Sequence, residues 1–134
     1  MDIILDTHIA LWALDGDRRL PKKAQDLISD ENNYVYFSAV SVMEVSIKHE
    51  KKSQEIDRSG RTFYQECLDA GYYTMPLKPK HAIWLDDLKV KEDAYVNKDP
   101  FDRALIAQAK QENMILLTHD RIMEYYDEPC IMLV

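Results

Sequence analysis

Four carboxylates occupy positions at which a folded chain would bring acids together. Asp6 directly follows a short apolar run, and Asp120 comes just after another. Glu44 and Asp102 lie beside apolar residues at helical spacing, which puts their side chains on core-facing helix stripes. Burying an ionised carboxylate costs several kcal/mol unless a cation or strong hydrogen bonds compensate it. The placement of these acids therefore needs an explanation.

A shared metal site is the explanation that accounts for all four acids at once. Crowded carboxylates repel one another, so some would become protonated unless cations bind between them. Oxygen ligands without a cluster of Cys or His favour Mg²⁺ or Mn²⁺. A metal held in this way orients a phosphodiester, generates hydroxide from bound water and stabilises the leaving oxygen. The expected chemistry is hydrolysis by in-line attack, which leaves a 5′-phosphate and a 3′-hydroxyl.

Helix capping is the alternative explanation for each acid taken alone. Asp6 and Asp120 could cap the helices that follow them, and Glu44 could form a capping box with Ser41. Asp99 precedes Pro100 at a helix start, and capping stays the favoured interpretation for that residue. The joint pattern of the other four favours the metal.

The elements that must position these acids alternate along the chain. Apolar and β-branched runs predict strands at 3–5, 34–37, 72–77, 114–117 and 130–134, and helices are expected at 7–14, 21–29, 39–52, 62–70, 79–89, 100–111 and 120–126. Residues 90–98 read as a polar connection, and Pro21 is expected at the first position of its helix. Several strands are apolar on both faces. The pattern predicts an α/β fold of three layers, with a mainly parallel central sheet flanked by helices.

Composition bounds the remaining classes of protein. The 134 residues carry a net charge of −7 and predict one domain over 1–134. Three widely separated glycines exclude a phosphate-binding glycine loop, and scattered His and Cys residues argue against structural zinc. Cys67 and Cys130 allow one disulfide at most, and a reduced, cytoplasmic protein is the simpler expectation. No apolar run approaches the roughly 20 residues of a membrane span.

The acidic balance argues against a generic nucleic-acid coat, which is usually basic. Part of that negative charge would belong to the acids of the metal site. Two bound divalent ions would change the net charge from −7 to −3. Residues 48–61 carry five basic and three acidic side chains. They could flank a path for RNA or form a solvated helix end.

Four segments closely resemble the motifs of the PIN-domain family, specifically its VapC-type toxins from type II toxin–antitoxin (VapBC) systems. They occur in the family's order and span nearly the whole chain: residues 5–14 (LDTHIALWAL), 38–48 (SAVSVMEVSIK), 98–109 (KDPFDRALIAQA) and 116–120 (LLTHD). The resemblance implies a PIN-like α/β/α domain and a Mg²⁺- or Mn²⁺-dependent endoribonuclease. It also implies a homodimeric toxin whose site is occluded by a small cognate antitoxin, and an antitoxin basic side chain could enter the acidic pocket.

The resemblance also assigns roles to individual residues. Asp6, Glu44, Asp102 and Asp120 match the family's acidic metal-binding quartet, and Thr118 matches a hydroxyl residue that orients metal-bound water. Asp99 belongs to the third motif and is a further candidate ligand, while Arg103 is structural or faces phosphate. The chain departs from the family where Met43 replaces a usual Trp and Asn97 a usual His.

Two other functions remain open at this level. A structure-specific DNA nuclease of the related flap-endonuclease type would use the same acids, but those enzymes need extra length to thread or clamp DNA. A non-catalytic PIN-like binding module would use the acids only as caps. It predicts that Mg²⁺ or Mn²⁺ leaves thermal stability unchanged, whereas a metal-binding nuclease gains stability by mass action.

Overall fold

The structure, a computed structural model, describes residues 1–92 and 98–134. Its elements follow one another in the order β1 (Asp2–Leu5), α1 (Thr7–Asp15), α2 (Lys22–Ser29), β2 (Tyr34–Ser38), α3 (Ala39–Lys51), α4 (Gly60–Asp69), β3 (Tyr73–Met75), α5 (Pro79–Ala82), η1 (Ile83–Asp86), α6 (Pro100–Glu112), β4 (Ile115–Thr118), η2 (Arg121–Tyr125) and β5 (Ile131–Leu133). Within the described ranges, no helix is long and apolar enough to cross a membrane.

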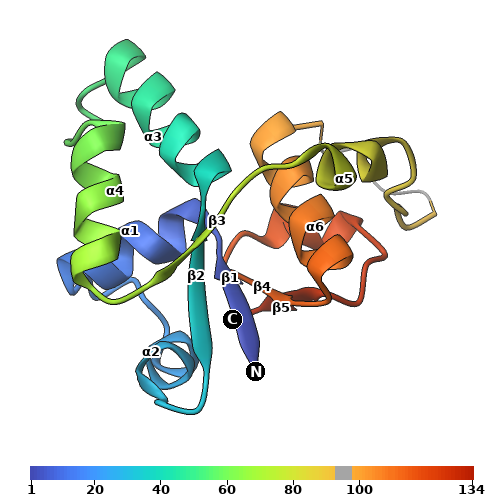
Figure 1. Ribbon diagram of the computed structural model, residues 1–134, viewed down its shortest axis with the longest axis horizontal. Helices are drawn as coiled ribbons and strands as arrows, with labels where there is room; N and C mark the ends of the chain where they lie inside the picture. The colour runs from blue at the N-terminus through green and yellow to red at the C-terminus, as the bar shows by residue number, and fades with distance from the viewer. Residues whose placement is uncertain (93–97) are drawn as a thin grey trace.

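The strands form one five-stranded sheet in the order β3-β2-β1-β4-β5, and every neighbouring pair is parallel. Strand β1 lies at the centre, where Ile4 pairs with Leu116 of β4 and Leu5 pairs with Leu117. Helices lie on both sides of this sheet (Figure 1). The expected parallel sheet is therefore confirmed.

Two apolar clusters fill the space between the sheet and its helices. Ile3 and Leu5 of β1 point into the cluster that includes Ala24 of α2 and Phe63 of α4. Ile4, between them, points to the opposite face and packs with Leu105 and its neighbours on α6. This alternation follows from the two-residue repeat of a strand. It confirms the three-layer α/β/α arrangement.

The helix expected over residues 79–89 is wrong in length. Only α5 is α-helical there, and η1 follows it as a 3₁₀ turn. The segment bonds to α6 instead of continuing its own ladder: Trp84 Nε1 donates to Gln111, and Arg103 donates to the Leu85 carbonyl at 2.5 Å. These contacts to α6 override the local helical propensity.

Two smaller expectations are also corrected. The expected helix at 120–126 is the 3₁₀ helix η2. Pro21 is the residue before α2 and not its first helical residue, because its backbone is extended. Asn97, one of the two departures from the family pattern, lies outside the described residues.

Gly60, where α4 begins, permits the close approach of α4 to α3. A Cβ at Gly60 would lie 1.8 Å from Ser46 Oγ and 2.8 Å from the Val42 carbonyl oxygen. The Ser46 hydroxyl can rotate away, but the Val42 carbonyl belongs to the helix backbone and cannot. We expect Gly60→Ala to lower the free energy of unfolding by about 1–3 kcal/mol, as measured by urea denaturation. Arg61→Ala, at the exposed neighbouring position, is the control, and equal stability of the two variants would contradict the prediction.

Candidate functional site

The candidate site lies at the edge of the sheet where the strands have their carboxyl ends. Asp6 follows β1, and Thr118 is the last residue of the neighbouring strand β4. The Asp6 amide donates to the Leu117 carbonyl at 2.9 Å, which fixes Asp6 against β4. Helix α3 starts from this edge after β2. Helix α6 ends next to the amino end of β4. Its first turn therefore lies at the carboxyl ends of the strands, near the site (Figure 1).

Asp6 is a buried carboxylate with two hydrogen-bond donors. Its Oδ1 accepts from the Thr7 amide and its Oδ2 from the Thr118 hydroxyl, both at 2.7 Å. Burial raises the pKa of Asp6 against the opposing hydrogen bond from Thr118, and the charge of Glu44 raises that pKa further. The fold thus holds a carboxyl group where its charged form is disfavoured, and a bound cation would relieve this.

Glu44 on α3 is equally buried, with 4% of its surface exposed. Its Oε1 accepts from the Thr7 hydroxyl at 2.6 Å, and its Oε2 accepts from Lys48 Nζ at 2.5 Å. The capping box with Ser41 is wrong, because Ser38 caps α3 and Ser41 lies within the helix beside the Thr7 hydroxyl. Glu44 therefore lies near Asp6 at the carboxyl edge of the sheet, called the acidic edge below, and not at the helix terminus.

Lys48 binds Glu44 and lies within electrostatic range of the acids at the start of α6. Burial by itself would lower the pKa of Lys48, but the hydrogen bond to Glu44 and the charges of Glu44, Asp99 and Asp102 together raise it. Its ammonium group therefore stays charged and faces acids from two helices.

The remaining sequence-predicted residues are placed as follows. The Thr118 hydroxyl, which donates to Asp6, also accepts from the Asp120 amide at 3.1 Å. Asp120 is exposed and caps η2 through the Ile122 amide. Asp99 caps α6, as expected, by accepting from the Phe101 and Asp102 amides at 2.8 and 3.2 Å. Asp102 itself is half-buried in the first turn of α6.

The structure places the four acids at one edge of the sheet, but their side chains do not surround a common metal position. Asp6 interacts with Glu44 through charge and with Asp120 through Thr118. Among the described residues, no three His, Cys, Asp or Glu side chains are close enough to hold a metal ion as they stand. The donor set nevertheless suits Mg²⁺ or Mn²⁺, since it consists of carboxylate and hydroxyl oxygens, two of the carboxylates being buried.

Sequence reasoning missed two residues that support the site. Thr7, taken only as the first residue of a helix, is fully buried and donates to Glu44. Gln108 of α6 is also buried, where it accepts from Ser38 Oγ at 2.5 Å and donates to the Pro76 carbonyl at 3.2 Å. Gln108 thereby ties α6 to the ends of β2 and β3. A polar residue inside the apolar stripe of α6 was the signal that could have identified it.

The basic segment at 48–61 divides into two parts. Arg58 is mostly buried and binds Asp15 of α1 at 2.6 Å and Glu66 of α4 at 3.3 Å, so it holds those helices together. Lys51 and Lys52 instead border a hollow of about 250 Å³, which is also lined by Ile47, Lys48, Glu55 and Phe101. Since Lys48 also contacts Glu44, this hollow lies next to the acidic edge.

Comparisons with known proteins agree with this architecture. The family model of the PIN domain matches residues 3–129. The structure of VapBC2 from Rickettsia felis, bound to a DNA fragment from its promoter, is similar with a TM-score of 0.67 and 16% identity, covering 100% of this chain and 98% of that one. FitAcB from Neisseria gonorrhoeae is similar with a TM-score of 0.53 and 17% identity, covering 92% and 91%. None of the curated proteins compared with the chain matches it.

Proposed function

The chain belongs to the PIN-domain family, and from this premise we propose that it is a Mg²⁺- or Mn²⁺-dependent endoribonuclease that acts as a toxin. The observation that carries the proposal is the pair of buried carboxylates, Asp6 and Glu44, at the carboxyl edge of a parallel sheet. Ligands of open α/β sheets bind at that edge. Asp6 caps α1, but capping does not account for the second buried carboxylate, Glu44, whose charge acts on Asp6.

Asp6, Glu44, Asp102 and Asp120 are the residues that would hold the metal, with Asp99 as a further candidate. A bound divalent ion would supply Lewis acidity and lower the pKa of water. Attack of water on phosphorus with cleavage of the P–O3′ bond would leave 5′-phosphate and 3′-hydroxyl ends. Thr118 fixes the orientation of Asp6 by donating its hydroxyl hydrogen to Oδ2, and its oxygen could accept a hydrogen bond from the attacking water. The buried hydroxyl of Thr7 holds Glu44 toward the site.

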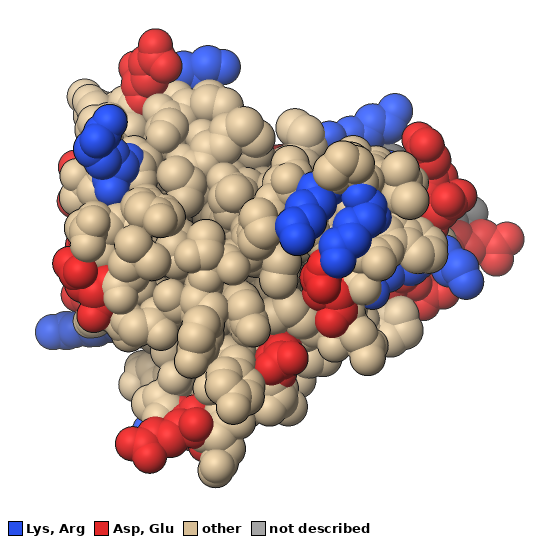
Figure 2. All heavy atoms as spheres, in the orientation of Figure 1, with Lys and Arg blue, Asp and Glu red and all other residues tan. Residues whose placement is uncertain are grey.

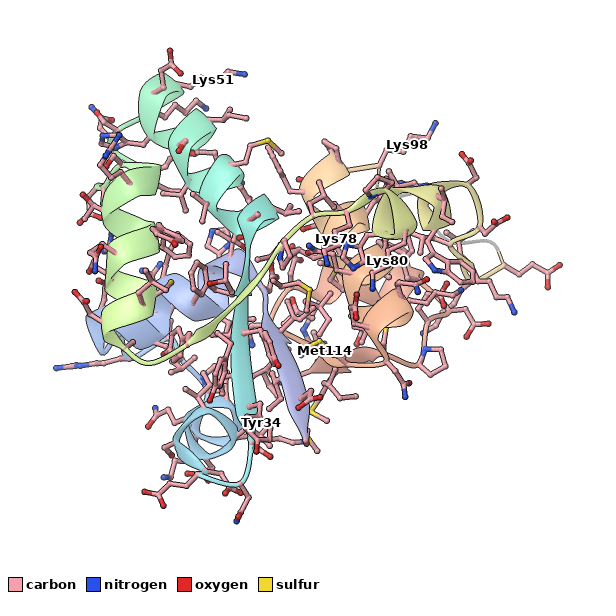
Figure 3. The ribbon with its side chains drawn as sticks, viewed as in Figure 1. Tyr34, Lys51, Lys78, Lys80, Lys98 and Met114 are labelled. Atoms are coloured by element: carbon pink, nitrogen blue, oxygen red, sulfur yellow. The ribbon has the colours of Figure 1, made fainter. Side chains whose placement is uncertain are left out.

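A nucleic-acid substrate is supported by the hollow beside the acids. Its lysines can neutralise a phosphate backbone, and the half-buried ring of Phe101 offers a surface on which a base can stack. Lys51 projects from the far end of α3 (Figure 3). Binding through a few local ammonium groups is consistent with a protein whose net charge is −7.

The partners follow from the same proposal. The two structures compared above carry the names of two-component assemblies, VapBC2 and FitAcB, which supports a small cognate antitoxin for this chain. The face across β2, β3 and α4 carries few charged side chains (Figure 2). Tyr34 of β2 and Tyr73 of β3 are exposed, and their ring centroids lie 5.9 Å apart. We expect a second copy of the chain to cover this face, and the mass of the purified chain by light scattering tests that homodimer.

The decisive experiment measures cleavage of structured RNA and of branched DNA by the purified chain in parallel assays. We expect RNA cleavage with Mg²⁺ or Mn²⁺, no cleavage with EDTA, and RNA fragments that carry 5′-phosphates. Cleavage of branched DNA alone would favour the flap-endonuclease alternative. A chain that cuts neither substrate and whose melting temperature does not change with metal would be a binding module.

A further inference from the structure

We propose that Lys48 is a built-in counter-ion that competes with the divalent metal for Glu44. In the metal-free protein its ammonium group occupies the Glu44 end of the acidic site, and metal binding requires that group to leave. The inference deepens the proposed function and rests on it, because it concerns the same metal site.

The contacts of Glu44 carry the inference. One carboxylate oxygen accepts from the Thr7 hydroxyl, and the other accepts from Lys48 Nζ at 2.5 Å. The Glu44 side chain is only 5% exposed, so water compensates little of its charge. Lys48 is therefore the cation that compensates this buried carboxylate in the structure as it stands.

The charges around Lys48 show that its position belongs to the whole site. Asp99 and Asp102 of α6 act on its ammonium group in addition to Glu44. One positive group thus faces acids from α3 and α6, which is the place that the proposed function gives to a metal. A divalent ion bound by Glu44 would add positive charge beside the ammonium group that Glu44 already binds, and two such cations repel strongly in a partly buried site.

Lys48 is able to leave. Its side chain is 33% exposed, and it also borders the hollow that contains Lys51, Lys52 and Phe101. Rotation of its flexible four-carbon stem can carry the ammonium group from Glu44 into that hollow. There it would join the lysines that we expect to contact the RNA backbone, so metal binding and substrate binding would favour the same position of Lys48.

The test measures metal affinity without RNA. Lys48→Met and Lys48→Arg are compared with the unchanged protein by Mn²⁺ electron paramagnetic resonance and by thermal denaturation with and without Mn²⁺ or Mg²⁺. We expect Lys48→Met to bind Mn²⁺ about tenfold more tightly, as loss of a competing, partly buried ion pair would produce. The same variant should melt at a lower temperature without metal, because Glu44 then lacks its cation. Lys48→Arg should keep the affinity near that of the unchanged protein.

Lys22→Met is the matched control. Lys22 forms an exposed i,i+4 pair with Asp26 on α2 at 2.7 Å, so its loss should alter neither metal affinity nor stability appreciably. Unchanged or weaker Mn²⁺ binding by Lys48→Met, while the unchanged protein binds Mn²⁺, would overturn the inference and leave the proposed function intact. Binding by Lys48→Met alone would support the inference but contradict a metal-dependent native enzyme. Absence of binding in both would overturn both proposals.

Discussion

Asp6→Asn should slow RNA cleavage severely and at the same time make the metal-free protein more stable. Loss of a charged ligand from the proposed metal site is expected to lower the cleavage rate by about a hundredfold or more. Asparagine can still accept from the Thr7 amide, so the start of α1 keeps its cap. The amide nitrogen of asparagine would take the place of Oδ2 and can donate to the Thr118 hydroxyl oxygen, so the substitution removes the charge and keeps a contact with β4.

The gain in stability follows from the raised pKa of Asp6. A carboxyl group whose pKa is higher in the folded than in the unfolded protein adds stability at low pH, and that stability is lost as pH rises through the folded-state pKa. Burial places Asp6 in this class, above the ordinary value of 3.8. Without metal, Asp6→Asn should match the unchanged protein in acid and exceed it increasingly toward neutral pH.

Urea denaturation at several pH values, with and without Mg²⁺, measures this effect. Mg²⁺ should stabilise the unchanged protein and leave Asp6→Asn unaffected. Asp2→Asn, an exposed substitution at the other end of β1, should change neither stability nor cleavage. Full cleavage by both Asp6→Asn and Asp102→Asn would contradict the assignment of the acids, whatever the stability data show.

The sequence predicted the sheet well because its strands are short, apolar runs between clear helix signals. A strand such as 3–5, buried on both faces, has one plausible place in an α/β fold, and it became the central strand β1. The segment after Pro79 was predicted poorly for the opposite reason. Its local pattern is helical, but hydrogen bonds with Gln111 and Arg103 of α6 determine its path. Such long-range contacts leave no periodic signal in the sequence.

The same contrast holds within the site. Burial of Glu44 could be predicted from its place on an apolar stripe, and the structure confirms it. Its partners could not, because Thr7 lies 37 residues away in the chain and Lys48 is one of several lysines that all suit a solvated helix end. The hydrogen bond from Thr118 to Asp6 spans 112 residues and requires β1 and β4 to be neighbours. Residue types thus indicated the chemistry, and only topology could show which groups meet.

Substitution of Glu128 is expected to cause the largest loss of stability outside the acidic site. Its side chain is 3% exposed and accepts from Lys110 Nζ with both oxygens at 2.9 Å and from the Lys89 amide at 2.9 Å. The Lys110 ammonium also lies 4.6 Å from the centre of the Trp84 ring. One carboxylate thus joins the end of α6, the segment after η1 and the loop before β5.

Glu128→Ala should lower the free energy of unfolding by about 3 kcal/mol, because it leaves a half-buried ammonium group and a backbone amide without their acceptor. Urea denaturation measures the loss, and Asp26→Ala, which breaks the exposed pair on α2, should cost less than about 1 kcal/mol. The double variant Glu128→Leu, Lys110→Met should recover much of the stability, since it removes both charges and leaves apolar groups in their place. A double variant as unstable as Glu128→Ala would show that the Lys89 amide, and not the ion pair, accounts for the loss. The single and double variants together therefore separate the contribution of the Lys110–Glu128 ion pair from that of the hydrogen bond between the Lys89 amide and Glu128.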